Sequence, residues 1–348
     1  MKKQNIINLV KYYIEKNDSA FRNEVLEIAN DFHNNGDIEI ASYLMDLIST
    51  TNYYQPQNNY RDLIYLTKHD NNNNKPLYLP EVIKDDILGI VRSANKNISI
   101  SKILFYGKPG TGKTESAFQI ARLMNRDILT VRMEDLIDSH LGQTSKNIIT
   151  LFDEIKHLYS NNVVILFDEI DALVMNRISN NDLREMGRVT STFLKEIDSL
   201  SDNIILIATT NLIEYIDNAL LRRFEAKISF DRYDNEDLIE VSEFILKDLL
   251  RKSSSSKADS RLFRKIIATA DKIPYPGDML QILKIAIAFS DDSNQYDYLR
   301  RLYIEINQNS DISIQKLTAQ GFTTREIEIL TGISKSSVAR KLRDDIDE

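Results

Sequence analysis

The sequence predicts an α/β fold in which helices cover both faces of a parallel sheet. Three short apolar runs, residues 103–106, 163–167 and 204–208, each have the length of a strand. Wholly apolar runs of this kind suit central parallel strands that are buried on both faces. A glycine-rich loop follows the first run and leads into a helix-forming stretch, and this order of strand, loop and helix supports the same fold.

The glycine-rich loop has the pattern G-x-x-x-x-G-K-[ST] of a phosphate-binding loop (P-loop). Its glycines let successive backbone N–H groups point at the phosphates of a nucleotide, and the following helix N-terminus adds partial positive charge. Lys113 would reach the β- and γ-phosphates, and the Thr114 hydroxyl would coordinate Mg²⁺. A chance glycine turn is the alternative, but the flanking strand and helix favour nucleotide binding. The expected binding residues are Gly107, Pro109, Gly110, Thr111, Gly112, Lys113, Thr114 and Glu115.

An acidic sequence follows the second apolar run, at the strand end where open α/β sheets bind ligands. Asp168 is placed to hold Mg²⁺ through its water shell, so Thr114 and Asp168 are the expected metal contacts. Glu169 is the candidate base that orients and deprotonates the attacking water. An acidic turn after a strand is common by itself, but its position downstream of a P-loop favours ATP hydrolysis.

The third apolar run ends in a polar strand tip with two arginines shortly after it. Asn211 at this tip can hydrogen-bond the attacking water or the γ-phosphate. Arg222 and Arg223 are either a solvated helix end or fingers that neutralise transition-state charge in a neighbouring subunit's ATP. The expected catalytic residues are therefore Glu169, Asn211, Arg222 and Arg223.

Together these motifs resemble those of AAA+ ATPases of the AAA-proper subgroup, over about residues 79–289. The resemblance implies the following assignments: Walker A at 107–114, Walker B at Asp168 and Glu169, sensor 1 at Asn211, and arginine fingers at Arg222 and Arg223. The two arginines are adjacent, as in katanin- and spastin-like members. The lid segment near 274–279 lacks the Gly-x-Arg of other AAA+ groups, which is normal in this subgroup. The adenine-side motif is matched only in part, by residues 86–89.

The resemblance also implies a loop that grips a polypeptide in the pore of a ring. Its aromatic-aliphatic-Gly triplet corresponds here to His140, Leu141 and Gly142, so an imidazole stands where an aromatic ring is usual. Imidazole is flat but offers less apolar area than a phenyl or indole ring. A surface loop distant from the nucleotide is the alternative.

Composition excludes several classes of protein. A net charge of −8 argues against broad, nonspecific binding of nucleic acid, and the absence of cysteine excludes disulfides and thiolate metal sites. The four histidines are scattered without ligand spacing, so no zinc site is expected. Residues 1–16 do not resemble a signal peptide, and no apolar run is long enough to span a membrane. We therefore expect a cytoplasmic protein with no membrane contact.

Apolar periodicity, the Asn-rich stretch at 71–74 and the resemblance to AAA ATPases together divide the chain into five parts. We expect an N-terminal helical domain at 1–50, a linker at 51–79, an ATPase core at 80–232, a helical lid at 233–309 and a tail at 310–348. Three apolar stripes with helical spacing predict helices within the first fifty residues. Small N-terminal domains of AAA proteins usually dock substrates or adaptors, so a role in partner binding is implied there.

The tail has the plan of a helix-turn-helix motif, with a Gly-containing turn between two short helices. Its last predicted helix carries basic and hydroxyl residues that suit contacts with phosphates and base edges. The candidate DNA contacts are Lys335, Ser336, Arg340, Lys341 and Arg343. The alternative is a helical hairpin that packs on the lid or on a neighbouring subunit.

Two functions remain as hypotheses. The first is an ATP-hydrolysing ring, expected from the resemblance to be a homo-hexamer, that remodels a protein substrate or threads it through a central pore, with ATP and Mg²⁺ as cofactors. The second is a DNA-associated regulatory or loader ATPase that uses the C-terminal helices. A nucleotide-switched scaffold that barely hydrolyses ATP is disfavoured by the presence of Glu169 and Asn211.

Overall fold

The chain divides into two compact units, residues 1–61 and 62–348. The computed structural model describes residues 3–14, 18–34, 37, 40, 63–69, 77–93, 100–137, 142–158, 163–172, 183–252, 257–291, 293–307 and 312–344. Among the described residues, no helix is long and apolar enough to cross a membrane.

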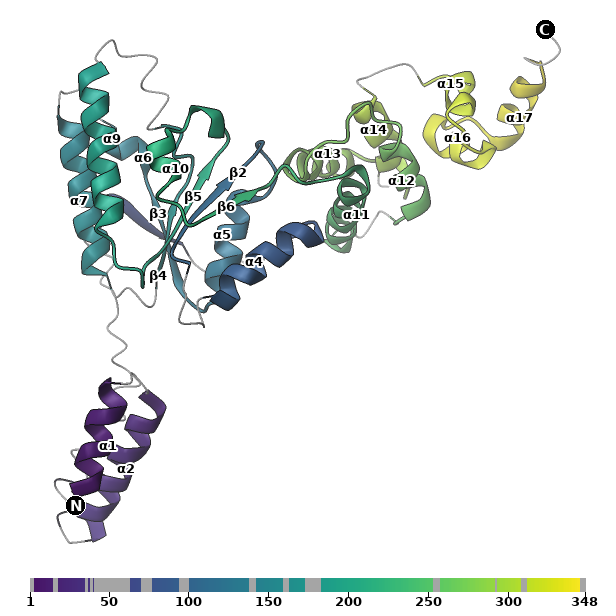
Figure 1. Cartoon of the computed structure of the whole chain (residues 1–348). Coiled ribbons are helices and arrows are strands. Elements are labelled where there is room, and N and C mark those ends of the chain that lie inside the picture. Colours follow the sequence, from purple (N-terminus) through teal and green to yellow (C-terminus); the bar gives the residue numbers. More distant parts are fainter. Residues whose placement is uncertain are drawn as a thin grey trace. The chain divides into compact units, whose positions relative to one another are not determined.

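The larger unit is built on a sheet with the strand order β1-β3-β4-β5-β2-β6, of which Figure 1 labels β2 to β6. The strands are β1 (Leu66–His69), β2 (Lys102–Tyr106), β3 (Asp127–Val131), β4 (Val163–Phe167), β5 (Ile205–Thr210) and β6 (Ala226–Ser229). Neighbouring strands are parallel, except that the edge strand β1 is antiparallel to β3. The predicted α/β fold is confirmed, and the three apolar runs are the neighbouring strands β2, β4 and β5.

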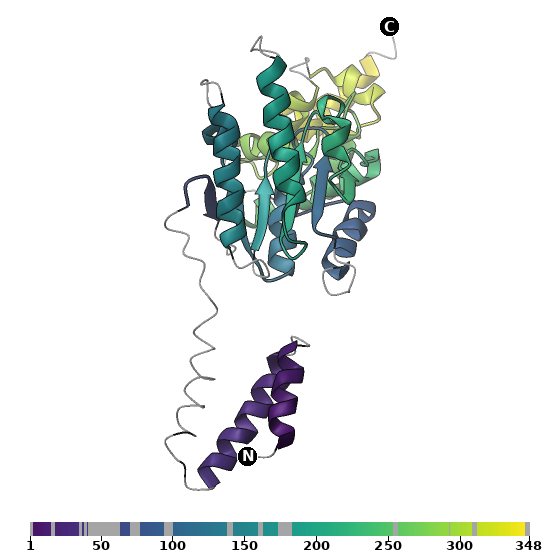
Figure 2. The ribbon, with the colours of Figure 1, turned by 60° about the vertical axis from the view of Figure 1, so that its left-hand side comes forward.

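Helices cover both faces of this sheet (Figures 1 and 2). Helices α4 (Glu81–Ser93) and α5 (Lys113–Leu123) share one apolar core with alternate residues of the strands. On the other face, Phe152 of α7 (Gln143–His157) and Phe193 of α9 (Leu183–Asp198) both contact Phe167 of β4, with ring centroids 5.9 and 5.6 Å away. Shorter elements connect these layers: α6 (Met133–Leu136), a 3₁₀ turn (Ile213–Tyr215) and α10 (Asn218–Leu221).

Part of the segment 51–79, which was predicted to be a linker, belongs to the sheet. Residues 66–69 form β1, in register with β3 so that Leu66 lies opposite Val131. Only Leu66 of this strand is buried, and such a short edge strand leaves almost no periodic signal in the sequence. The backbone N–H groups of Ile64 and Tyr65 donate to the carboxylate of Glu154, which fixes the chain just before the strand.

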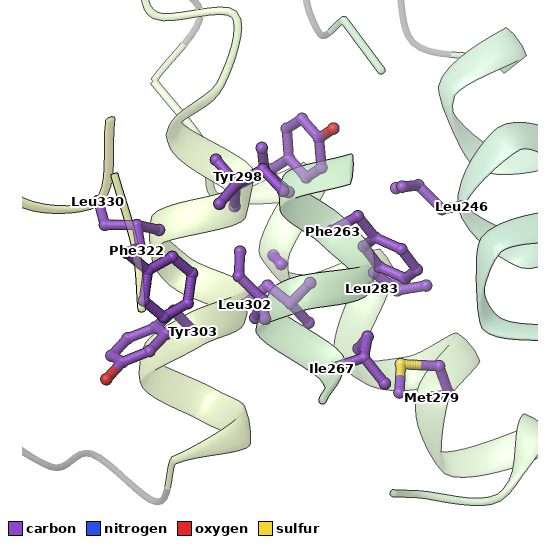
Figure 3. Close-up of a cluster of buried hydrophobic side chains, with 14 of the residues drawn as sticks. Leu246, Phe263, Ile267, Met279, Leu283, Tyr298, Leu302, Tyr303, Phe322 and Leu330 are labelled. Atoms are coloured by element: carbon purple, nitrogen blue, oxygen red, sulfur yellow. The ribbon is translucent and has the colours of Figure 1, made fainter. Parts of the chain in front are cut away.

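The lid and the tail share a single apolar core (Figure 3). The lid helices are α11 (Asn235–Lys252), α12 (Ser260–Ile267), α13 (Pro276–Ala288) and α14 (Asp297–Ile306), and those of the tail are α15 (Ile314–Ala319), α16 (Thr324–Thr331) and α17 (Lys335–Asp344). Tyr303 of α14 and Phe322 of the tail meet edge to face, with ring centroids 5.9 Å apart. The boundary predicted at 309/310 therefore does not separate two cores.

The smaller unit contains a helical hairpin of α1 (Lys3–Ile14) and α2 (Asp18–Asn34). Val25, Ile28 and Ala29 of α2 are buried, as expected for a small core. The apolar stripe of α1 is instead largely exposed, with Tyr13 at 75% and Ile14 at 73%. The third predicted stripe lies outside the described residues, apart from Ile40.

Phe322 should be essential for attaching the tail to the lid. Its side chain is buried and lies between the Tyr303 ring and the Lys265 ammonium, which is 5.0 Å from the ring centroid. We expect Phe322→Ala to cost about 3–5 kcal/mol of local stability. Hydrogen exchange should show lost protection in α15 to α17 and unchanged protection in α5.

Phe289→Ala is the matched control, because this ring is 65% exposed at the end of α13 and its removal leaves no cavity. Unchanged protection of α16 in Phe322→Ala, or an equal loss in both variants, would contradict the packing described.

Candidate active site

The strand order places three polar strand ends side by side. Strand β5 lies between β2 and β4, and all three are parallel. The loop after β2 holds Lys113, the turn after β4 holds Asp168, and Asn211 directly follows β5. These residues converge at the carboxyl edge of the sheet, where ligands of α/β proteins bind. The three motifs found in the sequence therefore lie together at this edge of the sheet.

The loop after β2 has the backbone shape that its glycines allow. Gly107, Gly110 and Gly112 have φ angles of 142°, 75° and 97°, in the left-handed region that side chains disfavour. Two side chains brace the loop: Thr111 Oγ1 donates to the Lys108 carbonyl at 2.8 Å, and the Lys108 N–H donates to Asp231 Oδ1 at 2.8 Å. Asp231 was not among the site residues predicted from the sequence.

Lys113 is buried at the start of α5 and its ammonium is surrounded by oxygen atoms. Nζ donates to the carbonyl oxygens of Gly107 and Lys108 at 2.7 and 2.8 Å and to Asn211 Oδ1 at 2.7 Å. Burial lowers the pKa of Lys113, and the negative charges of Asp231 and Asp168 act in the opposite direction. The hydrogen bond from Lys113 to Asn211 joins the P-loop to the end of β5. A phosphate oxygen can take the place of Asn211 as the acceptor.

The Asp168 carboxylate is the centre of a hydroxyl network. Thr114 Oγ1 donates to Asp168 Oδ1 at 2.9 Å, and Thr209 Oγ1 donates to the same oxygen at 2.6 Å. A hydroxyl and a carboxylate at this separation fit Mg²⁺, which prefers oxygen ligands, retains several waters and bridges to phosphates. Thr114 and Asp168 are thus the residues that would hold the metal. Thr209 was missed as a site residue, although the strand-tip sequence contains it.

Glu169 lies in the cleft with an unusual backbone conformation. Its φ angle is 56°, in a region that non-glycine residues rarely occupy. Its N–H donates to Thr209 Oγ1 at 2.9 Å, and the next N–H, from Ile170, donates to the Thr209 carbonyl at 2.9 Å. Such a conformation costs on the order of 1–3 kcal/mol and persists where neighbouring contacts enforce it. Here Thr209 fixes the backbone on both sides of the candidate base and directs Glu169 into the cleft.

The cleft has a volume of about 640 Å³ and continues from the phosphate end towards the lid. Its far end is apolar and suits a nucleotide base. The lining residues at this end are Leu77, Tyr78, Val241, Ile245, Leu249 and Leu280. The Tyr78 ring stacks on Phe244 with centroids 4.9 Å apart. Residues 86–89, the partial match to the adenine-side motif, lie in α4 and do not line the cleft, and Asp86 pairs with Arg232.

The lid touches the P-loop directly. The N–H of Gly277, at the start of α13, donates to the Gly110 carbonyl at 2.8 Å, and the Tyr233 hydroxyl donates to the Thr111 carbonyl at 2.8 Å. A methyl group on Gly277 would lie 2.7 Å from the Gly110 Cα atom, so only glycine permits this approach. Burial raises the pKa of Tyr233 well above its usual range, so its hydroxyl remains a donor to the loop.

The two candidate arginine fingers have different surroundings, and neither lines the cleft of its own chain. Arg223 donates from Nη2 and Nε to the Asp198 carboxylate at 3.0 and 3.2 Å, which ties it to the end of α9. Arg222 is exposed, and its side chain makes no ion pair with any residue that the structure describes. Of the candidate pore triplet, Gly142 has a φ of 78° at the start of α7, whereas His140 and Leu141 lie outside the described residues.

Residues 103–232 match the model of the ATPase family associated with various cellular activities (AAA). This chain contains an AAA ATPase domain. The chain is similar to an uncharacterized AAA family ATPase of Sinorhizobium fredii, with 38% identity over 132 residues, which are 38% of this chain and 39% of that protein. The peroxisomal ATPase PEX6 of Arabidopsis thaliana is 36% identical over 125 residues, 35% of this chain and 13% of that protein. Spastin of Drosophila melanogaster is 27% identical over 242 residues, 68% of this chain and 30% of spastin.

A solved structure confirms the fold. The AAA domain of FIGL-1, crystallised in complex with ADP, aligns with a TM-score of 0.51 and 18% identity, covering 73% of this chain and 91% of that one. The match to the AAA family model confirms the resemblance that the motifs predicted. The chain spans less than half the length of the curated relatives it matches.

Substitution of Gly277 should weaken nucleotide binding from the lid side. In Gly277→Ala the new methyl group must displace α13 from the P-loop, because the atoms it meets belong to the backbone of Gly110. Overpacking of this kind costs about 1–3 kcal/mol, so we expect roughly tenfold weaker binding of a fluorescent ATP analogue.

Gly187→Ala provides the comparison, since a Cβ at this exposed position in α9 meets nothing within 4 Å. Equal affinities in Gly277→Ala and Gly187→Ala would show that the contact between the lid and the P-loop does not support the nucleotide site.

Proposed function

We propose that this chain binds ATP with Mg²⁺ in the cleft, hydrolyses it within a ring of identical subunits, and uses the cycle to remodel or thread a protein substrate. The observation that carries this proposal is the joining of three motifs by hydrogen bonds, from Lys113 to Asn211 and from Thr114 to Asp168. A phosphate-binding loop, a metal-binding carboxylate and a water-orienting amide in direct contact form a hydrolytic site rather than a binding site alone.

The residues divide the chemistry of hydrolysis among themselves. The Lys113 ammonium exchanges its contact with Asn211 for phosphate oxygens, which frees the Asn211 amide to orient water. Glu169 accepts a proton from that water as the water oxygen bonds to the γ-phosphorus, the bond from this phosphorus to the β–γ bridging oxygen breaks, and ADP leaves. Thr114 and Asp168 would hold Mg²⁺, which would supply positive charge to stabilise the phosphates during hydrolysis. The hydrogen bond from the Gly277 N–H to the Gly110 carbonyl would keep the lid beside the P-loop during this step.

The assembly is a further part of the proposal. Arg222 lies outside its own cleft and is exposed, which suits a guanidinium that completes the site of a neighbouring copy. Arg223 would support it by holding the end of α10 against Asp198. In this proposal the segment 140–142 grips the protein substrate, and the exposed apolar face of α1 supports the docking of a partner.

Glu169→Gln should bind ATP normally and hydrolyse it at least about a hundredfold more slowly, because the amide keeps the shape and loses the base. Steady-state phosphate release and equilibrium nucleotide binding measure the two effects separately. With ATP, size-exclusion chromatography should show this variant accumulating as the assembled ring.

Two further variants serve as controls for that experiment. Glu240→Gln makes the same chemical change on an exposed face of α11 outside the cleft and should hydrolyse ATP at the normal rate. Lys113→Ala should lose ATP binding, since it removes the ammonium that contacts both the P-loop and Asn211. Turnover at the normal rate in Glu169→Gln would place the catalytic base elsewhere.

The arginines should act by different routes. Arg222→Ala should lower ATP hydrolysis by at least about a hundredfold while sparing ATP binding, as expected for a finger. Arg223→Ala should also lower hydrolysis, and Asp198→Asn should reproduce its defect because both changes break the same ion pair.

Mixing tests whether the finger acts in trans. Rings that combine Arg222→Ala subunits with Glu169→Gln subunits should regain ATP turnover at the interfaces where an intact arginine faces an intact glutamate. Full activity of Arg222→Ala alone, or ATP hydrolysis by an isolated monomer at the rate of the ring, would refute the assignment.

A further inference from the structure

The three helices of the tail pack against one another, with a tight turn between α16 and α17. Helix α16 begins with a capping box, in which Thr323 and Glu326 each bond the other's backbone N–H. It ends at Gly332, whose φ of 73° turns the chain sharply, and the Ser334 carbonyl accepts the Val338 N–H at 2.9 Å in the first turn of α17. The turn is therefore fixed at both ends by local hydrogen bonds.

Helix α17 is held at a defined angle on this unit. The N–H of Lys335 donates to Glu328 Oε1 at 3.0 Å, so a side chain of α16 caps the start of α17. Val338 is fully buried in the core that the tail shares with the lid, and Leu342 packs against that core one turn later. Apolar contacts therefore determine which face of α17 is turned towards the core.

The tail is attached to the lid through α15 and α16. Lys265 of α12 donates to the Gly321 carbonyl at 2.6 Å and to Glu326 Oε2 at 2.8 Å, and Tyr303 donates to Gln320 Oε1 at 2.7 Å. Helix α17 lies at the outer end of the chain, beyond α15 and α16 as seen from α14 (Figure 1). These contacts occupy the acidic group of Glu326 and leave the outer face of α17 uncovered by the described residues.

That outer face is polar and positively charged. Ser336, Arg340 and Arg343 follow one another at intervals of four and three residues, so they share the face opposite Val338. All three are exposed, and Lys335 and Lys341 are exposed on the flanks. Within the described part of the chain, none of these four basic side chains forms an ion pair. The acidic residues of α16 are occupied, because Glu326 pairs with Lys265 and Glu328 caps α17.

The chemistry of this face selects its partner. Among the described tail residues, none of the large apolar side chains is exposed, which disfavours an apolar protein interface. Phe322, the aromatic residue of the described tail, is buried, so single strands lack a ring on which to stack. A helix bearing guanidinium and hydroxyl groups matches the DNA major groove, about 12 Å wide, whereas the deep, narrow major groove of RNA duplexes excludes side chains.

We propose that the tail binds double-stranded DNA, with α17 in the major groove and with Ser336, Arg340 and Arg343 facing the base edges and phosphates. Seven residues of helix span about 10.5 Å, so the side chains of this stripe reach several base pairs along the groove. This inference concerns the tail alone and stands or falls separately from the ATPase proposal. The net charge of −8 does not oppose it, because the positive charge is local.

The test measures binding of the whole chain to a fluorescently labelled DNA duplex of mixed sequence by anisotropy at low salt. Wild type should bind, and its affinity should fall steeply as salt is added. Arg340→Ala combined with Arg343→Ala should weaken binding at least about tenfold and lower the salt dependence. ATP turnover of this variant should be unchanged, which shows that the protein is folded.

Three comparisons make the result decisive. Arg251→Ala combined with Arg300→Ala removes the same charge from exposed positions of the lid and should bind DNA as wild type does. Arg340→Lys combined with Arg343→Lys should keep the salt dependence. Unlabelled single-stranded DNA and duplex RNA should compete poorly with duplex DNA. The proposal is overturned if wild type fails to bind duplex DNA at low salt, if the lid variant loses as much affinity, or if single strands compete equally.

Discussion

The site is organised around one buried positive charge. An ammonium removed from water is costly unless oxygen atoms surround it, and Lys113 meets this requirement with two loop carbonyls and the Asn211 amide. The loop must curl to present those carbonyls, which its glycines allow, and β5 must lie beside β2 to bring Asn211 into range. Phosphate offers the ammonium a stronger, charged acceptor than an amide, so the same arrangement that stabilises the free protein favours nucleotide.

A second constraint couples the sheet to the helical part of the molecule. The cleft has a phosphate end built on strand termini and a base end built partly on the lid. Gly277 and Tyr233 contact the P-loop backbone directly, so a nucleotide that shifts the loop also shifts the start of α13. Because the contact joins backbone to backbone at Gly277, it leaves little freedom for the lid to move independently of the loop.

The sequence predicted those parts of the structure that depend on local chemistry. Apolar runs identified β2, β4 and β5, and motifs identified Lys113, Asp168, Glu169 and Asn211, because each pattern follows from a strand or a phosphate contact. The base end could not be predicted in this way. Tyr78 and Leu249 come from distant segments and are ordinary apolar residues until the fold brings them together.

Other features depend on tertiary context as well. Strand β1 buries only Leu66 and gains its pairing from β3, and Asp231 is defined as a site residue only by its distance from the Lys108 N–H. Likewise, the sequence could not show that Arg223 forms an ion pair, because its partner Asp198 lies 25 residues earlier in the chain.

The core shared by the lid and the tail has a mechanical consequence. Tyr303, Phe322 and Val338 belong to one packed cluster, so side chains of the described tail residues pack directly against those of the lid. Close-packed interiors have low compressibility and transmit strain. A rotation of the lid is therefore transmitted directly to α17. A force that acts on α17 is transmitted in the same way to Gly277, which contacts the P-loop.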